Sequence, residues 1–550
     1  MKISPTLRMV GLFGLLLALA AAGPVAPASS FNVNSNVDSP DVSPGNGTCA
    51  DISGHCTLRA AVMEANAHTG PDTIVLPSGT LTLTIAGADE DGALTGDLDI
   101  TGTVTLRGAG LALSRVDATG LNDRIFDVLP GAHASLSDLT IQHGTIPVTG
   151  LSSGGGVLNA GTLTLTRVSL THNNLGDESN LHFGGALANI FPGSVAILSS
   201  QVISNEAELG ALSNEYQMTL VNSVVMSNVA TFGAGLYNQG TLNMQTTQVL
   251  SNTGAIVGGG FYARNGQTTV SDSLINGNQA DYGGAFWVHD ATVSISRSTL
   301  RANQSKNSGG ALQVDSGSVE LVNTTLLLNG AADDGGALNV AGGQVSALNT
   351  TLTQNHAEHN GGAVNLVGGV LAGYNLTIIG NIAHVGGQGV GTGGGIYHGV
   401  AGTVTLSNTI LSENLHATNT PFSVEDDCAG TTIYMHYSRL GTATGCTFNS
   451  DNTLTGEFLD LLPLGDYGGS SLTIALGPLS AAIDKRDVAG CTAPFGLVSF
   501  NQRDLPRPVD GTTTAWPAAI SGRTKCSSDC SYRCFGAEQD ALLFVAASYE

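Results

Sequence analysis

The sequence predicts an all-β protein whose central part is a right-handed parallel β-helix, a solenoid in which each coil of chain stacks on the one before. Two repeats in the 550-residue chain predict this fold. In the first, an apolar residue follows a glycine-rich segment at positions 187, 212, 236, 261, 286, 312, 338, 364 and 396, so the period is 24 to 26 residues until a final interval of 32. In the second, an asparagine stands three places after an apolar residue, at Asn173, Asn205, Asn228, Asn252, Asn278, Asn303, Asn329, Asn355, Asn381 and Asn414.

Each coil is expected to hold two or three short strands separated by glycine or asparagine corners. The segment 319–326 alternates apolar and polar residues, which is the period of a strand. Coils that stack at the ~4.8 Å spacing of neighbouring strands bring equal positions into ladders, so the ten asparagines should bond to one another along one corner. A β-sandwich or a propeller is the alternative. Propeller blades of roughly 40–45 residues are longer than these repeats, and the chain has only 2 Trp.

The pattern divides the chain into four expected parts. These are a signal peptide at residues 1–28, an N-terminal capping segment at 29–72, the β-helix repeats at 73–415 and a disulfide-rich C-terminal module at 416–550. Within the capping segment, Leu58, Val62 and Ala65 fall on one helical face, so residues 57–67 are expected to form a short amphipathic helix that closes the open end of the solenoid.

The first part has the features of an export signal. Lys2 and Arg8 precede an apolar run at 9–22, and small residues lead to an A-x-A cleavage site after Ala28, with 20–22 as a competing site. An uncleaved anchor helix is the alternative, but about 14 apolar residues are short for a membrane span. No later run approaches ~18 apolar residues. The mature chain is therefore expected to be secreted or held at the cell surface without a transmembrane segment.

Composition and charge limit the partners. The chain carries 19 Lys+Arg against 43 Asp+Glu, a formal net charge of −24, and only 11% of its residues are charged. A polyanion binder needs a basic stripe, so nucleic acid and anionic membrane surfaces are excluded as expected partners. Gly is 74 of 550 residues and the apolar fraction is 42%, which favours a packed, turn-rich protein over a disordered one.

All eight cysteines lie near the two ends, at Cys49, Cys56, Cys428, Cys446, Cys491, Cys526, Cys530 and Cys534. An even count behind an export signal predicts structural disulfides that staple the terminal parts and leave the repeats alone. A zinc site in the Cys526-x3-Cys530-x3-Cys534 run is the alternative, although it lacks the usual C-x2-C knuckle.

Two terminal segments carry a family resemblance. The stretch from Cys49 to Asn66, CADISGHCTLRAAVMEAN, resembles the CSLREA-type N-terminal segment of bacterial exported β-helix proteins, with Thr57 and Ala60 in place of the usual Ser and Glu. The tail segments LPLGDYGG at 462–469, GPLSAAID at 477–484 and NQRDLPRP at 501–508 resemble the choice-of-anchor Q domain. The repeats are also similar to those of polymorphic outer-membrane protein arrays.

The resemblance implies a pectin-lyase-like solenoid exported to the surface or medium, with no defined catalytic activity. It also implies that a disulfide ties the tail together, pairing Cys491 with Cys534. With Cys49–Cys56 closing a short loop beside the capping helix and Cys428–Cys446, this leaves Cys526 to pair with Cys530.

Parallel β-helices also host polysaccharide lyases and hydrolases, so acidic and histidine side chains in the coils are candidate catalytic residues. The candidates are Asp333 and Asp334 with His356 and His359 one coil later, Asp281 and Asp290 around Trp287 and His289, and Tyr397 with His398. Each has a simpler interpretation, because an Asp pair before two glycines is typical of turns and lone histidines on corners are usually solvated. Cations in the repeats are few, mainly Arg264, Arg297, Arg301 and Lys306. No residue is therefore assigned a catalytic role.

No cofactor is expected apart from a structural calcium ion, for which Asp89, Glu90, Asp91, Asp97 and Asp99 offer five carboxylates in eleven residues. A solvated acidic loop is the alternative. The sequence as a whole predicts a non-catalytic, exported β-helix protein for adhesion or for recognition of a glycan or host surface. The alternative is a polysaccharide lyase or glycoside hydrolase on the same solenoid, because the fold alone does not decide function.

Overall fold

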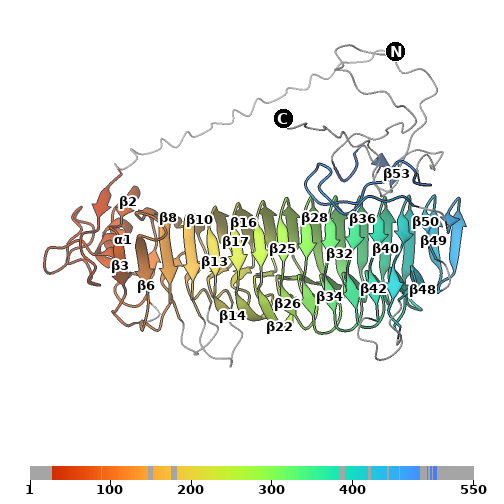
Figure 1. Ribbon diagram of the computed structural model, residues 1–550. Coiled ribbons are helices and arrows are strands. Elements are labelled where there is room, and N and C mark those ends of the chain that lie inside the picture. The colour runs from red at the N-terminus through yellow and green to blue at the C-terminus, as the bar shows by residue number, and fades with distance from the viewer. Residues whose placement is uncertain are drawn as a thin grey trace, which may run out of the picture.

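The computed structural model describes residues 28–503 except 88–89, 146–152, 175–182, 385–390, 419–422, 443–444, 457–458, 483–491, 494–495 and 498–499. The described chain is an all-β parallel solenoid of about 12 turns with one helix at its N-terminal end (Figure 1). The predicted fold class is therefore confirmed. In the part of the chain that is described, no helix is long and apolar enough to cross a membrane. The expected signal peptide lies outside that part, apart from Ala28.

A typical coil has four short strands. In one coil these are β15 (Leu212–Asn214), β16 (Gln217–Val221), β17 (Val224–Met226) and β18 (Val229–Phe232). Each pairs in parallel with its equivalent one coil later, in register except where the pairing of β18 with β22 shifts between Ala230 and Phe232. The strands are separated by two residues, and the corners before β17 and β18 each contain one residue with positive φ, Asn222 at 51° and Ser227 at 55°. The result is three long sheets that run the length of the solenoid.

The three sheets contain 29, 13 and 10 strands. The 13-stranded sheet consists of β4 (Leu98–Ile100), β7 (Phe126–Val128), β9 (Val157–Asn159), β11 (Leu187–Asn189), β15, β19 (Leu236–Asn238), β23 (Phe261–Arg264), β27 (Phe286–His289), β31 (Leu312–Val314), β35 (Leu338–Val340), β39 (Val364–Leu366), β43 (Ile396–His398) and β48 (Cys428–Gly430). The 10-stranded sheet consists of β14 (Glu206–Leu209), β18, β22 (Thr253–Val257), β26 (Gln279–Ala280), β30 (Gln304–Ser305), β34 (Gly330–Ala331), β38 (His356–Ala357), β42 (Ile382–Ala383), β46 (Leu415–His416) and β47 (Val424–Glu425).

The 29-stranded sheet takes two strands from most coils. Its strands are β1 (Ser30–Asn32), β2 (Pro71–Val75), β3 (Gly79–Thr82), β5 (Thr103–Arg107), β6 (Ser114–Asp117), β8 (His133–Gln142), β10 (Thr162–Thr171), β12 (Ser194–Leu198), β13 (Gln201–Ile203), β16, β17, β20 (Thr241–Gln245), β21 (Gln248–Leu250), β24 (Gln267–Ser271), β25 (Leu274–Asn276), β28 (Ala291–Ser296), β29 (Thr299–Arg301), β32 (Gly317–Val322), β33 (Thr325–Leu327), β36 (Gln344–Leu348), β37 (Thr351–Thr353), β40 (Val370–Tyr374), β41 (Thr377–Ile379), β44 (Thr403–Ser407), β45 (Ile410–Ser412), β49 (Ile433–His436), β50 (Arg439–Leu440), β51 (Phe448–Asp451) and β52 (Leu454–Thr455). A separate pair is formed by β53 (Thr492–Ala493) and β54 (Gly496–Leu497).

The glycine pairs are needed where the 10-stranded sheet turns into the 13-stranded sheet. Gly309 has φ of 72°, and a Cβ there would lie 2.5 Å from the Leu312 carbonyl oxygen. Gly310 has no positive φ, but a Cβ there would lie 2.1 Å from the Gly336 oxygen of the next coil. The first glycine is therefore required by backbone conformation and the second by the close approach of neighbouring coils.

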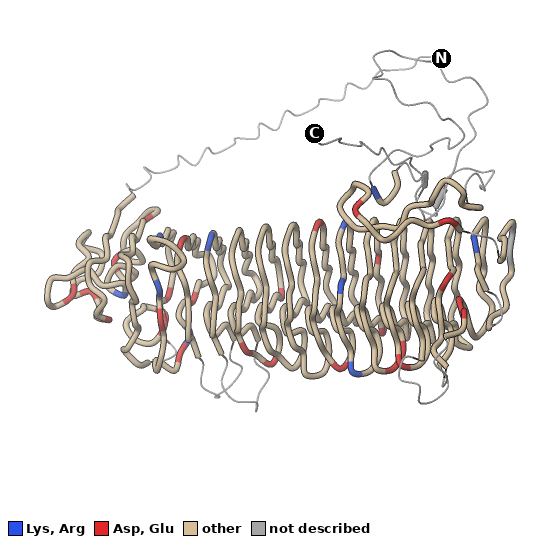
Figure 2. The backbone as a smooth tube through the Cα atoms, viewed as in Figure 1, with Lys and Arg blue, Asp and Glu red and all other residues tan. Residues whose placement is uncertain are grey.

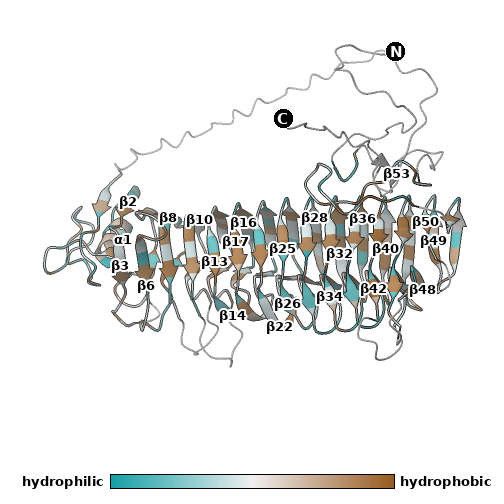
Figure 3. Cartoon of the chain, in the orientation of Figure 1, coloured by the Kyte–Doolittle hydropathy of each residue, from teal (hydrophilic) through white to brown (hydrophobic). Residues whose placement is uncertain are grey.

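The predicted asparagine ladder is confirmed. All ten asparagines from Asn173 to Asn414 stack, and each Nδ2 donates to the Oδ1 of the next at 2.8 to 3.0 Å. The ladder ends when Asn414 donates to Asp427 Oδ1 at 2.8 Å. A second, shorter ladder, which the sequence analysis does not predict, runs through Asn159, Asn189, Asn214 and Asn238. Apolar side chains fill the rest of the interior, which gives the strands their alternating hydrophobic bands (Figure 3).

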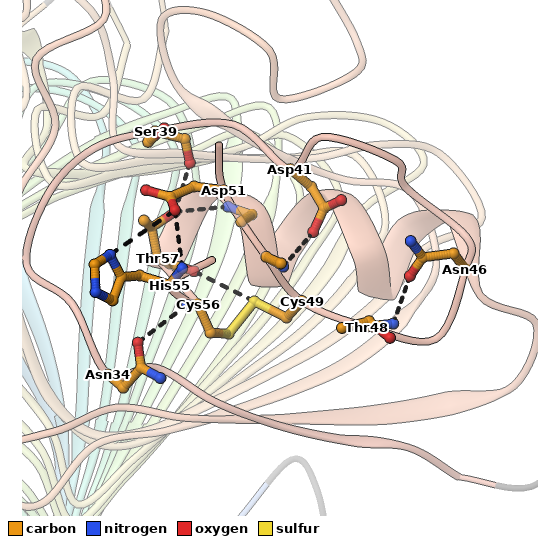
Figure 4. The surroundings of a disulfide bond; sticks show 12 residues. Asn34, Ser39, Asp41, Asn46, Thr48, Cys49, Asp51, His55, Cys56 and Thr57 are labelled. Carbon is orange, nitrogen blue, oxygen red and sulfur yellow. Dashed lines mark hydrogen bonds and ion pairs between the residues drawn. A yellow bond between two sulfur atoms is a disulfide. The ribbon is translucent and has the colours of Figure 1, made fainter. Parts of the chain in front are cut away.

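The predicted capping helix is also confirmed, as α1 (Leu58–Ala67). Thr57 caps it by accepting a hydrogen bond from the Ala60 N–H. The disulfide Cys49–Cys56 closes the loop that leads into the helix (Figure 4). Arg59, fully buried, pairs with Asp38 at 2.7 Å and donates to three carbonyls of the loop 93–97. A buried arginine is tolerated only when its donors are satisfied in this way.

Parallel strands of the 29-stranded sheet continue to β52, beyond the expected boundary at residue 415. That boundary stays a prediction. The disulfide Cys428–Cys446 lies in these last coils. The structure thus contains two of the four disulfide pairs that the sequence predicts, and Cys491, Cys526, Cys530 and Cys534 lie outside the described residues.

After β52 the chain turns back along the outside of the solenoid (Figure 1). We call residues 459–482 and 500–503 the C-terminal strap. Its Leu459, Leu476 and Ala482 pack on Ile410, and its Ser471 donates to the Asn323 carbonyl at 3.0 Å. Consequently the strap covers the outer face of β33, β37, β41 and β45.

Candidate functional site

The outer face of the 13-stranded sheet carries the most distinctive row of side chains. Its strands are three or four residues long, and the first residue of each points into the core, as Leu236 and Leu312 do. The second residue therefore points outward. We call this row the outer strip; from β4 to β48 it reads Asp99, Asp127, Leu158, Ala188, Ser213, Tyr237, Tyr262, Trp287, Gln313, Asn339, Asn365, Tyr397 and Ala429.

Three consecutive coils place aromatic rings in the outer strip. The ring centroids of Tyr237 and Tyr262 are 5.2 Å apart, and those of Tyr262 and Trp287 are 4.6 Å apart. Phe183 and Phe232, from the turn side, pack against the two tyrosines. Burial raises the pKa of both tyrosine hydroxyls. Because each ring covers the next, the tyrosines are only 2% and 5% exposed, and Trp287 at the end of the stack is partly exposed.

A chain of hydrogen bonds continues the outer strip beyond Trp287. Asn365 Nδ2 donates to Asn339 Oδ1 at 2.7 Å, and Asn339 Nδ2 donates to Gln313 Oε1 at 2.8 Å. Gln313 Nε2 and Trp287 Nε1 both donate to the carboxylate of Asp315, each at 2.6 Å. Asn365 Oδ1 is buried without a hydrogen-bond partner among the described residues. The amides are thus held rigidly, and one acceptor is left over.

The structure brings together one of the predicted candidate groups beside the outer strip. Asp333 pairs with His359 through Oδ1 and Nδ1 at 2.6 Å, and Asp334 Oδ1 accepts from the Asn360 N–H at 2.8 Å. Ligand atoms of Asp333, Asp334 and His359 all lie within 4.8 Å of one another. Burial raises the pKa of Asp334, as a general acid requires. His356 lies elsewhere, in the 10-stranded sheet against Gly330, and desolvation lowers its pKa.

The other candidates do not converge. Asp281, before β27, is bound by Lys306 at 2.9 Å. Asp290, after β27, lies 3.6 Å from His289 Nε2. Tyr397 lies in the outer strip, but His398 points inward, where its Nδ1 donates to the Thr432 carbonyl oxygen at 3.0 Å. These residues therefore belong to separate turns rather than to one site.

A buried acidic cluster stands at the N-terminal end of the outer strip. Asp97, Asp99 and Asp127 have ligand atoms within 4.8 Å of one another. Burial raises the pKa of Asp97 to about 8 and that of Asp99 to about 7, and it raises the pKa of Asp127 as well, against the attraction of Arg124. Of the calcium candidates in the sequence, Asp97 and Asp99 belong to this cluster, and Asp127 was missed because it lies one coil away. Carboxylate oxygens so arranged suit calcium. Asp89 lies outside the described residues.

The charge distribution supplies no cationic surface in the described coils. Figure 2 shows acidic positions gathered at the N-terminal end and along the edge of the coils, with few basic ones. Arg297 is bound to Asp272 at 2.7 Å, as Lys306 is to Asp281. Arg264, at the end of β23, is exposed and lies beside Tyr237 and Tyr262, so a uronate polymer would meet one cation among several carboxylates near the outer strip.

No family model matches the sequence, and no curated protein matches it. Three solved structures are similar to the chain. The chain is similar to pectate lyase Pel9A, with 10% identity over 94% of this chain and 98% of that one and a TM-score of 0.27. It is similar to the A-module of the Azotobacter vinelandii mannuronan C-5 epimerase AlgE6, with 12% identity over 77% and 99% and a TM-score of 0.30. It is also similar to a PL6 alginate lyase solved with a trisaccharide, with 10% identity over 81% and 91% and a TM-score of 0.28. Likenesses with TM-scores this low carry no argument about this chain.

Proposed function

We propose that the protein is an exported, non-catalytic β-helix protein that recognises an extended polysaccharide or a glycan of a host surface through the outer strip. Export rests on the N-terminal signal pattern and on disulfides, which form in oxidising compartments. The family resemblance at the two ends of the chain points the same way.

The observation that carries the proposal is the junction at Trp287. There the partly exposed indole of Trp287 ends the aromatic stack and donates a hydrogen bond to Asp315. Asp315 also accepts from Gln313, the last amide of the hydrogen-bonded chain that begins at Asn365. Aromatic rings cover the apolar faces of sugars, so Trp287 would supply the contact face. Gln313, Asn339 and Asn365 are only 5%, 6% and 1% exposed, so they hold Asp315 and the indole in place, and a rigid site loses little entropy on binding. Strip positions repeat coil by coil, which suits a repeating polymer. The carboxylates beside it favour a neutral polymer.

The proposal is tested with a polysaccharide array probed with residues 29–550, read both for binding and for new reducing ends or unsaturated products. We expect saturable binding of a neutral polymer without products. Trp287→Ala should weaken binding about tenfold, the size of one lost aromatic contact. Tyr434→Ala, which removes a 43% exposed ring from β49 on another sheet, is the matched control and should bind normally. Equal binding by both variants would contradict a role for the strip.

An enzyme is the second candidate, because Asp334 has a raised pKa beside the Asp333–His359 pair. A glycoside hydrolase using this pair would release reducing ends, and activity would vanish in both Asp333→Ala and Asp334→Ala. The same array, run with and without calcium, separates the two functions. Turnover that depends on these residues would replace the recognition proposal.

A further inference from the structure

A second feature outside the outer strip is a hollow on the edge where the 13-stranded sheet turns into the 29-stranded sheet. It lies over three successive turns and measures about 270 Å³. Its lining residues are Glu215, Tyr216, Gln217, Gln239, Gly240, Thr241, Asn265, Gly266 and Gln267. We call it the turn hollow.

Two consecutive turns that line the turn hollow have glycine at the same position. A Cβ on Gly240 would lie 2.3 Å from the Tyr216 carbonyl oxygen, and one on Gly266 would lie 2.5 Å from the Gly240 oxygen. The backbones of successive turns therefore approach so closely that both positions require glycine. The floor is therefore backbone, while Tyr216 and the longer side chains of neighbouring positions form the walls.

Two aromatic rings stand exposed at one end of the turn hollow. Phe191, in the turn after β11, is 70% exposed, and Tyr216, in the turn after β15, is 37% exposed. Their centroids are 5.2 Å apart in an edge-to-face arrangement. Lone exposed aromatic residues are ordinary, but a pair beside a hollow marks a surface that binds something.

The remaining walls are neutral and polar. Gln217, Gln239, Asn265 and Gln267 supply amide groups, and Glu215 is the one charged residue among the lining side chains. Amides both donate to and accept from hydroxyl groups, whereas the carboxylate of Glu215 repels an anionic ligand. Drug-sized ligands occupy roughly 300–1,000 Å³, so the turn hollow suits one small polar unit rather than a chain.

We propose that the turn hollow binds a single neutral sugar unit, with a ring face against Tyr216 or Phe191 and its hydroxyls bonded to the surrounding amides. This site goes beyond the proposed function, because it needs no residue of the outer strip. It would hold a terminal or branch sugar of a glycan, or a free sugar, while the strip binds an extended polymer.

The test uses saturation-transfer NMR on the mature full chain, residues 29–550, with glucose, galactose, mannose and N-acetylglucosamine as neutral probes and galacturonate as the anionic probe. We expect saturable transfer to at least one neutral sugar and none to galacturonate. Tyr216→Ala and Gln239→Ala should each weaken that binding about tenfold, the loss of one aromatic or polar contact. The side chains of Tyr216 and Gln239 lie at the surface, so both variants are expected to fold as the unmodified chain does.

Tyr434→Ala again serves as the exposed-ring control and should bind the sugar as the unmodified chain does. The inference is overturned if no neutral sugar binds, if Tyr216→Ala and Gln239→Ala bind as tightly as the control, or if galacturonate binds equally well. Binding of polymers on the array is read separately. A failure of the turn hollow is therefore distinguishable from a failure of the outer strip.

Discussion

Replacing Asn303 with alanine removes one rung from the middle of the asparagine ladder. The Asn303 side chain donates to the Ile275 carbonyl and to Asn329 Oδ1, and its Oδ1 accepts from the N–H and the Nδ2 of Asn278, all at 3.0 Å. The residue is 0% exposed, so water does not replace these bonds. Four buried hydrogen bonds at about 1 kcal/mol each predict a loss of about 4 kcal/mol in the free energy of unfolding.

Because coils contact only their neighbours, the loss should be local. We expect hydrogen exchange, read by mass spectrometry, to become about a thousandfold faster in peptides covering 275–329, since each 1.36 kcal/mol is tenfold. Asn303→Asp tests the mechanism further. It keeps the shape and the accepting oxygen but cannot donate when ionised, so it should be destabilised at pH 7 and recover partly in acid.

Asn243→Ala is the matched control, because Asn243 is an exposed outward residue of β20. Its effect should stay within about 0.5 kcal/mol. If Asn303→Ala and Asn243→Ala exchange alike around their sites, the ladder does not stabilise the solenoid and the reasoning fails.

Three further predictions concern the ends and the repeat. Burial raises the pKa of Asp427 to about 6, so the native state binds its proton more tightly than the unfolded chain, and the stability of the last coils should fall as pH rises from about 4 through 6. Asp427→Asn should flatten that dependence in exchange measurements on 414–442, and an unchanged slope would contradict the assignment. Gln502 is 1% exposed and its side chain is hydrogen-bonded to Thr325, Thr351 and Ser471, so it holds the C-terminal strap on the solenoid. Gln502→Ala should therefore speed proteolysis within 459–503. Leu479→Ala is the control, because it removes a 78% exposed side chain and should leave the rate of proteolysis unchanged. Deleting residues 284–309, one complete coil, should leave a solenoid whose circular dichroism spectrum is that of a folded β protein. Deleting residues 310–335 should also release the strap, because Thr325 is lost. If the first deletion unfolds the protein, the assigned register is wrong.

The repeating part of the fold could be predicted because each coil needs the same residue types at the same positions. Asn303 and Gly309 recur at fixed intervals, and a repeated polar residue among apolar ones indicates a ladder. The second ladder, at Asn159, Asn189, Asn214 and Asn238, escaped because it spans only four coils and then gives way to Ala263. The position of the strap could not be predicted for another reason. Its hydrogen bonds to the coils join residues more than 120 positions apart, such as Gln502 and Thr351, which are 151 positions apart, and no local sequence pattern indicates such a pairing.

For the candidate site, the sequence predicted individual residues and one group of residues, but not how they are arranged along the outer strip. Asp333, Asp334 and His359 were recognised as a group because one coil separates them, and the structure brings them together. Trp287 was noticed for its residue type, but its partner Asp315 lies in the next coil and carries no signature of its own. The outer strip becomes visible only once the register assigns Tyr237, Tyr262 and Trp287 to the same outward position.

The asparagine ladder ends on a carboxylate at its C-terminal end, where Asp427 follows Asn414. An asparagine in mid-ladder accepts from the coil on one side and donates to the coil on the other, so it satisfies both neighbours. Beyond Asn414 the next position is taken by Asp427, which accepts from Asn414 through Oδ1 and from the Thr442 N–H through Oδ2, at 2.8 and 2.6 Å. An amide there would place its NH2 against that N–H. At the other end Asp99 and Asp127 begin the outer strip, and Asp99 accepts from the Ala93 N–H of the loop that Arg59 holds. Asp427 ends the asparagine ladder and Asp99 begins the outer strip, and burial raises the pKa of both carboxyl groups.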